Sequence, residues 1–420
     1  MSDRFDAMAT RMAQRAREAS RALAVAESGL KNRALGAVGD RLRVDREAIK
    51  EANAADLEAA RRDGLSPAMI DRLALDDSRI DAMAKGVREI VRLPDPVGEI
   101  IDQWDRPNGL RLERVRVPLG VIFLIYESRP NVTVDAAALC IKSGNACVLR
   151  GGREALQSNL ALHRAITAGI ESVGLPAEAV QMVQVTDHAF ADALLRQDRW
   201  IDVVIPRGGE QLIRAVVEKS TIPVIKHYKG ICHIYVDKSA DLAKATAIVL
   251  NAKCQRPGVC NAMETLLVHR ALSGAYLVDL LGQLAAKGVT IRGCPRTRDV
   301  FAQAEPASED DWTSEYLDLI LAVRVVDTMD EAIDHIARYG SSHTDAIVTE
   351  SREAAEQFVR RVDSSSVMVN ASTRFSDGGE YGLGAEVGIS TDKLHARGPM
   401  GIRDLTTYKY VVRGNGQVRS

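Results

Sequence analysis

From residue 119 onward, short apolar runs alternate with amphipathic segments of helix length, and this alternation constrains the fold more than any other feature. Short apolar runs bounded by turn signals are typical of buried strands. A repeated strand-helix-strand order favours a parallel sheet with helices on both faces. We expect strands at 119–126, 146–149, 180–185, 200–205 and 222–225. The sequence therefore predicts a doubly wound α/β domain, in which ligands bind at the carboxyl ends of the strands.

A second block of the same kind follows residue 260. Its expected strands lie at 264–268, 289–291, 317–326, 345–349 and 366–369, with helices such as 329–338 between them. The chain has 420 residues, which exceeds the size at which a single hydrophobic core usually stops growing. We therefore predict two α/β domains.

Two further regions flank these blocks. Residues 1–92 are rich in Ala, Arg, Glu and Leu, and the spacing of Met8, Met12 and Ala16 predicts amphipathic helices. Asn108-Gly109 separates two strand-like runs, and this dipeptide is a strong signal for a hairpin because both central residues of its turn need positive φ. The tail is rich in glycine and ends in the alternating run LTTYKYVVRG, which favours an edge strand.

Composition excludes several classes of protein. The formal net charge of −2 gives no reason to expect nucleic acid or an anionic membrane as a partner. Six cysteines are too few for a disulfide framework, and none stands at the spacing of a zinc-ligand pair, so we expect no metal. The N-terminus lacks the apolar core of a signal peptide, and the longest apolar run, 117–126, is too short to span a membrane. We expect a cytoplasmic protein.

Cys260 is the candidate nucleophile. It stands in a short loop after the helical run 241–253 and the Pro257-Gly258 break, just before an apolar strand that begins at Met263. Backbone N–H groups exposed in such a loop favour a thiolate and can hold an oxyanion. The alternative is that Cys260 is a small buried hydrophobe.

Two expected strands end in glycine turns, Arg150-Gly151-Gly152 and Arg207-Gly208-Gly209. Glycine lets the backbone approach a phosphate closely, and the arginine adds positive charge. Both turns can equally be ordinary connections from strand to helix. Neither matches the GxGxxG fingerprint of dinucleotide-binding proteins.

Three long segments carry a family resemblance: VPLGVIFLIYESRPNVTVDAAALCIKSGNACVLRGG, QRPGVCNAMETLLV and YGSSHTDAIVTES. With the two α/β blocks, the early hairpin and the late strand, they resemble the aldehyde dehydrogenase superfamily and, within it, the gamma-glutamyl phosphate reductase (glutamate-5-semialdehyde dehydrogenase) family. The resemblance implies a cofactor-binding domain at 1–97 and 118–229 and a catalytic domain at 230–395. It also implies oligomerisation strands at 98–117 and 405–416, which form a small β flap.

The resemblance also implies roles for individual residues. Cys260 matches the family nucleophile, and Asn131 resembles the asparagine that completes the oxyanion hole. Arg150 falls where relatives contact the adenosine ribose, and an arginine there suits the 2′-phosphate of NADP. The turn at Arg207 falls beside the pyrophosphate, and Glu315 matches the acid that holds the nicotinamide ribose.

The implied activity is NADPH-dependent reduction of L-glutamyl 5-phosphate to L-glutamate 5-semialdehyde, with release of phosphate, through a thioester on Cys260. This is the second step of proline biosynthesis from glutamate. One difference from other members of the superfamily is consistent with reduction of an acyl phosphate. Hydrolytic members carry a water-activating glutamate in an ELGG motif, where this chain has His227-Tyr228-Lys229-Gly230. A reductase of an acyl phosphate needs no activated water.

The implied substrate carries a carboxylate and a phosphate, so the pocket needs cations. Arg129, Arg256 and His343 are the candidates. Each arginine can instead form a surface ion pair, and His343 can be a capping or core residue. The resemblance further implies a homodimer or homotetramer and possible association with glutamate 5-kinase.

Three alternative functions stay open from the residues. The chain can be another thiol-dependent dehydrogenase that acts on an aldehyde or an acyl-CoA. It can be a Cys-His hydrolase with His227 or His233 as the base, although the glycine turns would then have no role. It can also be a relative without catalytic activity that acts as a binding protein, a reading that the presence of Cys260 opposes.

Overall fold

Two α/β units make up the computed structural model, which describes residues 2–419. Unit 1 holds the described residues up to Lys226, together with Leu383–Gly388 and the described residues from Met400 onward. Unit 2 holds His227–Gly382 and Ile389–Pro399. A two-stranded sheet of β14 (Gly388–Ser390) and β15 (Gly398–Met400) lies where the chain passes between the units. Among residues 2–419, no helix is long and apolar enough to cross a membrane.

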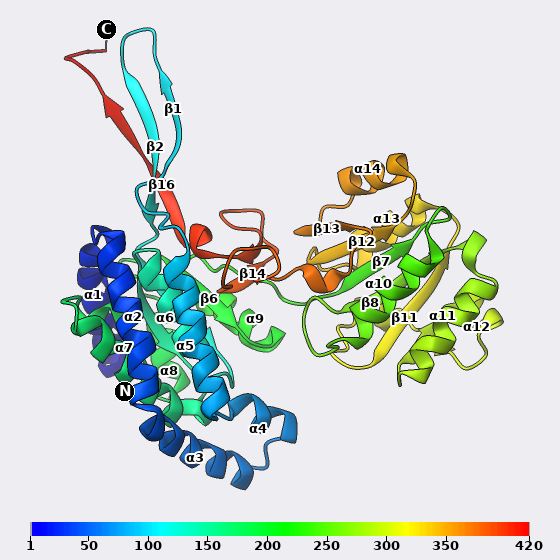
Figure 1. The fold of residues 1–420 in the computed structure, drawn as a ribbon, viewed down its shortest axis with the longest axis horizontal. Coiled ribbons are helices and arrows are strands. Elements are labelled where there is room, and N and C mark those ends of the chain that lie inside the picture. The colour runs from blue at the N-terminus through cyan, green and yellow to red at the C-terminus, as the bar shows by residue number, and fades with distance from the viewer. Residues whose placement is uncertain (1, 420) are drawn as a thin grey trace. The chain divides into compact units, whose positions relative to one another are not determined.

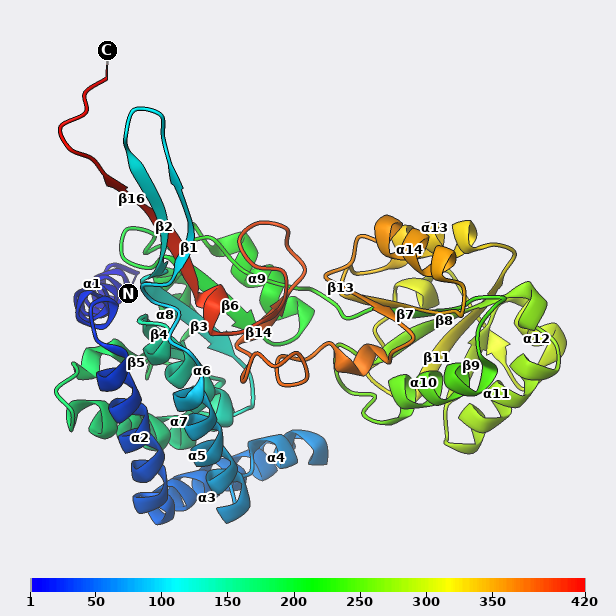
Figure 2. The same cartoon turned by 45° about the horizontal axis from the view of Figure 1, so that its top comes forward.

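Unit 1 (Figure 1) is built on a parallel four-stranded sheet in the order β5-β4-β3-β6, and all four strands are labelled in Figure 2. The strands are β3 (Val121–Tyr126), β4 (Ala146–Arg150), β5 (Val180–Met182) and β6 (Val203–Arg207). Every residue of β3 is buried, which explains why its sequence is apolar throughout rather than alternating. Between and after these strands lie α6 (Asn131–Lys142), α7 (Leu156–Glu171), α8 (His188–Leu194) and α9 (Glu210–Lys219).

The predicted helices of the first 92 residues are confirmed as α1 (Ser2–Ala24), α2 (Ser28–Val44), α3 (Arg46–Arg62), α4 (Pro67–Leu73) and α5 (Asp77–Arg92). They form because apolar residues recur at helical spacing, as with Ala9, Ala13 and Ala16, all fully buried. Helix α2 packs against α5 and α7. The crossing with α7 is close, since a Cβ on Gly169 would lie 2.7 Å from the backbone nitrogen of Val38.

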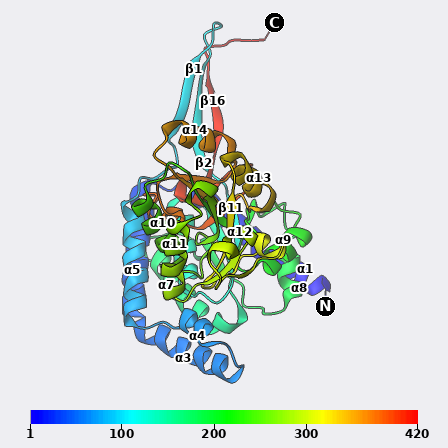
Figure 3. The ribbon, with the colours of Figure 1, turned by 90° about the vertical axis from the view of Figure 1, so that its right-hand side faces the viewer.

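The predicted hairpin is confirmed as β1 (Ile100–Asp105) and β2 (Arg111–Pro118), with Gly109 of the turn at φ +82°. The expected turn type was wrong, because Asn108 does not have positive φ. The last strand, β16 (Thr406–Arg413), pairs antiparallel with β2 along its whole length and completes a three-stranded sheet. This sheet extends away from the helices of unit 1 (Figures 1 and 3). No partner for β16 within the chain was predicted, because local sequence patterns do not indicate pairing between strands so far apart in the chain.

Unit 2 is built on a seven-stranded parallel sheet in the order β10-β9-β11-β8-β7-β12-β13. Its strands are β7 (Cys232–Val236), β8 (Met263–His269), β9 (Thr290–Gly293), β10 (Glu305–Pro306), β11 (Ile320–Val326), β12 (Thr344–Val348) and β13 (Ser366–Val369). Helices α10 (Leu242–Cys254), α11 (Ala275–Ala286) and α12 (Pro295–Val300) lie on one face of the sheet, and α13 (Met329–Tyr339) and α14 (Arg352–Arg361) lie on the other (Figure 2).

Two separate apolar clusters show that both faces of this sheet are covered. One cluster joins the sheet to α10 and α11 through residues such as Val249 and Leu281. The other joins it to α13 and α14 through Ile336 and Phe358. The doubly wound fold predicted from the sequence is therefore confirmed.

One predicted strand was wrong, and one central strand was missed. The run 222–225 makes only a single bridge, between Val204 and Val224, because Pro223 lacks a backbone donor and limits a ladder. Conversely, β7 lies at the centre of unit 2 but was not predicted. His233 and Tyr235 interrupt its apolar pattern, although both side chains are fully buried.

Candidate active site

Cys260 lies in unit 2 at the amino edge of the sheet, in the loop between α10 and β8. Strands β8, β7 and β12 are parallel neighbours, so the segments that precede them meet at one edge. His227 precedes β7, and His343 directly precedes β12. One donor atom each of His227, Cys260 and His343 lies within 4.8 Å of those of the other two. The fold thus brings two imidazoles to the predicted nucleophile.

His343 is fully buried in this cluster. Burial and, to a smaller extent, the neighbouring His227 together lower its pKa to about 3. Its Nδ1 atom lies 2.9 Å from the hydroxyl of Thr344 and 3.7 Å from Sγ of Cys232. The sequence proposed His343 as a cation for the substrate. Its full burial favours the alternative considered for this residue, a core histidine, and its role in substrate binding stays a prediction.

His227 is half-buried. Its Nδ1 atom lies 2.9 Å from the carbonyl oxygen of Ile389, and its ring meets that of His343 edge to face, with centroids 5.6 Å apart. The other candidate base, His233, lies within β7 and hydrogen-bonds Asp345 at 2.8 Å. Of the two histidines considered from the sequence, only His227 belongs to the thiol cluster.

The backbone of Cys260 is held closely by the segment before β7. A Cβ on Gly230 would lie 2.0 Å from the carbonyl oxygen of Cys260. The same carbonyl accepts a hydrogen bond from Sγ of Cys232 at 3.2 Å, and Gly230 donates its N–H to Glu315 at 2.9 Å. The carboxylate of Glu315, which the resemblance assigns to the nicotinamide ribose, therefore holds the segment before β7 that lies against the backbone of Cys260.

Two arginines lie near the thiol. Arg374, in a short 3₁₀ helix at Thr373–Phe375, donates to Oε1 of Gln255 at 2.8 Å and to the side chain of Asn261. Burial lowers its pKa, and the charge of Arg256 lowers it further, while Cys260 acts in the opposite direction. The sequence analysis named Arg256 as a candidate cation for the substrate but did not name Arg374. Arg374 is a lone arginine just before the glycine-rich segment, so no local pattern indicated a role for it.

A buried ion pair ties together the two elements that flank Cys260. Lys253, in the last turn of α10, lies 2.6 Å from Glu264 of β8, and both side chains are fully buried. Burial raises the pKa of Glu264 to about 7, although Lys253 opposes that shift. Removal of either partner would leave an uncompensated polar group in the core. The pair therefore fixes the ends of the loop that carries the nucleophile.

The two predicted glycine turns lie in unit 1, at the carboxyl ends of β4 and β6 on either side of β3. Gly151 has no room for a side chain, since a Cβ there would lie 2.1 Å from Nδ2 of Asn159. Gly209 begins α9, and its N–H donates to the carboxylate of Glu127 at 3.0 Å. This amide is therefore already placed to bind an anion.

The remaining predicted residues are placed as follows. Arg150 ends β4, is half-buried and lies 3.3 Å from Nδ1 of His188. Arg129 is exposed in the loop after β3. Asn131 begins α6 and donates to Asp135 at 3.1 Å. All three lie in unit 1, whereas Cys260 lies in unit 2.

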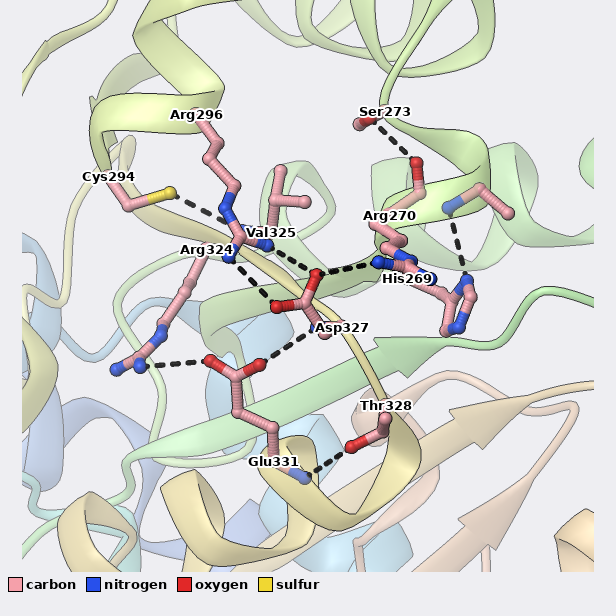
Figure 4. A network of polar contacts seen from close by, with 11 residues as sticks. His269, Arg270, Ser273, Cys294, Arg296, Arg324, Val325, Asp327, Thr328 and Glu331 are labelled. Carbon is pink, nitrogen blue, oxygen red and sulfur yellow. Dashed lines mark hydrogen bonds and ion pairs between the residues drawn. The ribbon is translucent and has the colours of Figure 1, made fainter.

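A second polar network lies at the other edge of the unit 2 sheet, where β8 and β11 end (Figure 4). The carboxylate of Asp327 accepts from both terminal nitrogens of Arg296, at 2.7 and 2.9 Å, and these contacts lower its pKa. Arg324 donates to Glu331 at 3.1 Å. A cavity of about 470 Å³ opens beside these side chains. No predicted site residue lines it. Its charged groups already have partners, since Arg296 pairs with Asp327, Arg324 pairs with Glu331, and Glu309 accepts from the hydroxyl of Tyr339.

Comparison with known proteins decides the family. The aldehyde dehydrogenase family model matches residues 6–300. The chain belongs to the aldehyde dehydrogenase family. It is 57% identical to a gamma-glutamyl phosphate reductase of Moorella thermoacetica, over 97% of each chain. It is also 53% identical to one of Paramagnetospirillum magneticum, over 99% of this chain and 98% of that protein.

The crystal structure of gamma-glutamyl phosphate reductase from Thermotoga maritima matches with a TM-score of 0.97 and 48% identity, and covers 98% of this chain and 100% of that one. The fold expected from the resemblance is thereby confirmed.

The aldehyde dehydrogenase family uses a nicotinamide cofactor, and the residues of unit 1 fit such a group. The N–H of Gly209, the residue before α9, donates to the carboxylate of Glu127. Gly151 has no side chain, which lets a ligand approach the backbone at the end of β4. Arg150 and Arg207 supply positive charge beside the two turns. This donor set suits the phosphates of a dinucleotide.

Proposed function

We propose that this chain reduces L-glutamyl 5-phosphate to L-glutamate 5-semialdehyde with NADPH and releases phosphate, the second step of proline biosynthesis. The identity of 53–57% to relatives named gamma-glutamyl phosphate reductase, over nearly the whole chain, carries this proposal. The cluster around Cys260 supports it, because a thiol beside an imidazole is an arrangement suited to nucleophilic catalysis.

In this mechanism Cys260 attacks the acyl carbon of the substrate, a carbon–sulfur bond forms, and the carbon–oxygen bond to phosphate breaks. His227 accepts the thiol proton, since it is the half-buried imidazole of the cluster. The reduced nicotinamide, when bound, supplies the hydride that converts the thioester to the aldehyde. The backbone N–H of Cys260 stabilises the oxyanion that develops in both steps, and the family resemblance assigns the second donor to Asn131.

Substrate recognition falls to arginines in this proposal. Arg374 lies within electrostatic range of both Arg256 and Cys260. Guanidinium groups bind phosphate and carboxylate through paired hydrogen bonds, so these two residues suit the anionic groups of an acyl phosphate. Arg129 keeps its predicted role as a further cation.

The direct test runs the reaction backwards. Purified protein is incubated with glutamate 5-semialdehyde, phosphate and NADP, and reduction of the cofactor is followed by absorbance. We expect reduction that depends on phosphate. If coenzyme A replaces phosphate as the required acceptor, the protein is an acyl-CoA-dependent dehydrogenase instead. Thioester hydrolysis with no cofactor reduction would favour the hydrolase.

The choice of NADP over NAD depends on Arg150 in this proposal. Replacement of Arg150 by alanine removes the cation predicted to meet the 2′-phosphate, so the KM for NADPH should rise about tenfold, equivalent to about 1.4 kcal/mol. The KM for NADH, which lacks that phosphate, serves as the control and should change little. An equal rise for both cofactors would contradict the assignment.

We also propose a homodimer or homotetramer assembled through β1, β2 and β16. Tyr408, Tyr410 and Val412 of β16 are about half exposed, as is Ile100 of β1, and exposed apolar strands are typical of interfaces. Replacement of Tyr410 and Val412 by aspartate should lower the molar mass measured by light scattering, while circular dichroism stays unchanged. An unchanged mass would exclude this sheet as the interface.

A cytoplasmic location completes the proposal. All six cysteines are free thiols in the structure, and reduced thiols are typical of proteins of the cytoplasm. A nucleophilic thiol also needs a reducing compartment to stay active.

A further inference from the structure

The cluster around Cys260 has the donor atoms of a transition-metal site. It offers one sulfur, from Cys260, and two imidazole nitrogens, from His227 and His343, all within 4.8 Å of one another. Sulfur and imidazole nitrogen are the ligands that Zn²⁺ prefers, whereas Mg²⁺ and Ca²⁺ prefer oxygen. All three residues lie in unit 2, at the amino ends of neighbouring strands.

The far side of each imidazole is held as in metal-binding histidines. Nδ1 of His227 lies 2.9 Å from the carbonyl oxygen of Ile389, to which it donates. Nδ1 of His343 lies 2.9 Å from the hydroxyl of Thr344. Histidines that bind metals usually donate one ring N–H to such an oxygen, which fixes the tautomer and leaves the other nitrogen as the ligand. In both residues that other nitrogen is Nε2.

The Nε2 atom of His343 gives a second, independent indication of a ligand. It is buried and has no hydrogen-bond partner in the structure, and the whole side chain is inaccessible to solvent. A buried polar atom without a partner is costly.

We propose that His227, Cys260 and His343 bind Zn²⁺ and that the bound metal reversibly blocks the thiol. Zinc bonds of about 2.0–2.3 Å require ligand atoms roughly 3.3–3.8 Å apart. The three ligand atoms, which lie within 4.8 Å of one another, therefore move closer together when the metal binds. Three protein ligands leave a fourth position for water. The sulfur lone pair that would attack an acyl carbon is then committed to the metal.

This site could not be predicted from the sequence, because its ligands lie in the segments before three different strands rather than in a closely spaced pair. Zinc binding follows from the cluster alone. The inhibition rests on the proposed function, in which Cys260 is the nucleophile. Binding and inhibition are therefore measured separately.

The binding experiment uses the full chain with Co²⁺ as a spectroscopic probe and Zn²⁺ in competition with a chromophoric chelator. We expect one metal ion per chain and a thiolate-to-cobalt charge-transfer band. Cys260→Ser should remove the band, and Cys294→Ser, which changes a half-buried thiol outside the cluster, should keep it. His343→Ala should weaken zinc binding by more than about 100-fold, since loss of an outer-shell partner alone costs about 10–100-fold.

A second measurement does not depend on the folding of any variant. In the wild-type protein, Zn²⁺ should protect Cys260 from alkylation, as read by mass spectrometry of the modified peptide, and a chelator should restore the reaction. An unprotected Cys260, or a cobalt band that persists in Cys260→Ser, would overturn the site. If zinc binds and protects but reductase activity is absent, the proposed function fails and the metal site stands. If the reductase is active and zinc neither binds nor inhibits, only the metal site fails.

Discussion

Replacement of Cys260 by serine is expected to reduce turnover with glutamate 5-semialdehyde, phosphate and NADP by at least about 10³-fold. The hydroxyl has nearly the shape of the thiol but is far less nucleophilic near neutral pH. In a well-studied serine protease, loss of the nucleophile costs on the order of 10⁶ in kcat. Steady-state kinetics with cofactor absorbance as the signal measures the effect.

The matched control for this variant is Cys294→Ser, since Cys294 is also half-buried in unit 2 but lies at the carboxyl end of β9. It should keep activity close to wild type. Circular dichroism and thermal unfolding should be the same for both variants, because neither thiol fills the centre of the core. Activity of Cys260→Ser within tenfold of wild type would show that no thioester forms on this residue.

Local patterns were enough to predict the fold class and the loop that holds Cys260, whereas the role of Cys260 as nucleophile came from the family resemblance and stays a prediction. The helical run that ends near Lys253 and the apolar strand from Met263 are each recorded in consecutive residues, so the loop that holds Cys260 could be placed between them. The turn at Gly109 was predictable for the same reason, since its positive φ is a property of the dipeptide itself.

The companions of Cys260 could not be predicted by such means. His227 and His343 reach the thiol only because β7 lies between β8 and β12, and strand order is set by packing across the whole sheet. Strand β7 itself was missed, because its alternation with His233 hides a strand that is buried on both faces. The full burial of His343 could not be predicted for a related reason, since burial is a property of the folded chain.

Arg374 shows a third limit of the sequence. It lies on a short 3₁₀ helix far along the chain, and only the folded structure brings it to Asn261 and Gln255 beside the thiol. The family resemblance assigned roles to residues that match family motifs, and Arg374 was not among them. A lone arginine in a glycine-rich segment has no periodic pattern from which a role can be inferred.

Replacement of Gly230 by alanine is expected to lower kcat by about 100-fold or more while the fold is retained. The added Cβ would lie 2.0 Å from the carbonyl oxygen of Cys260 and 2.6 Å from its Cα and carbonyl carbon, all backbone atoms that cannot rotate away. Real Cβ atoms essentially never approach other atoms within 3.0 Å, so the nucleophile must move by about 1 Å, and a shift of that size costs about 10² in rate.

Gly282→Ala is the matched control for this prediction. Gly282 lies in α11 of the same unit, and a Cβ there would meet nothing within 4 Å. This change should keep activity and raise stability by up to about 1 kcal/mol, since alanine favours a helix more than glycine does. Kinetics and thermal unfolding of the two variants then separate placement of the thiol from general stability. If Gly230→Ala kept full kcat, the close approach of this segment to Cys260 would not be what positions the nucleophile. If it lost activity with an unchanged alkylation rate of Cys260, the backbone shift would act on the oxyanion site rather than on the thiol.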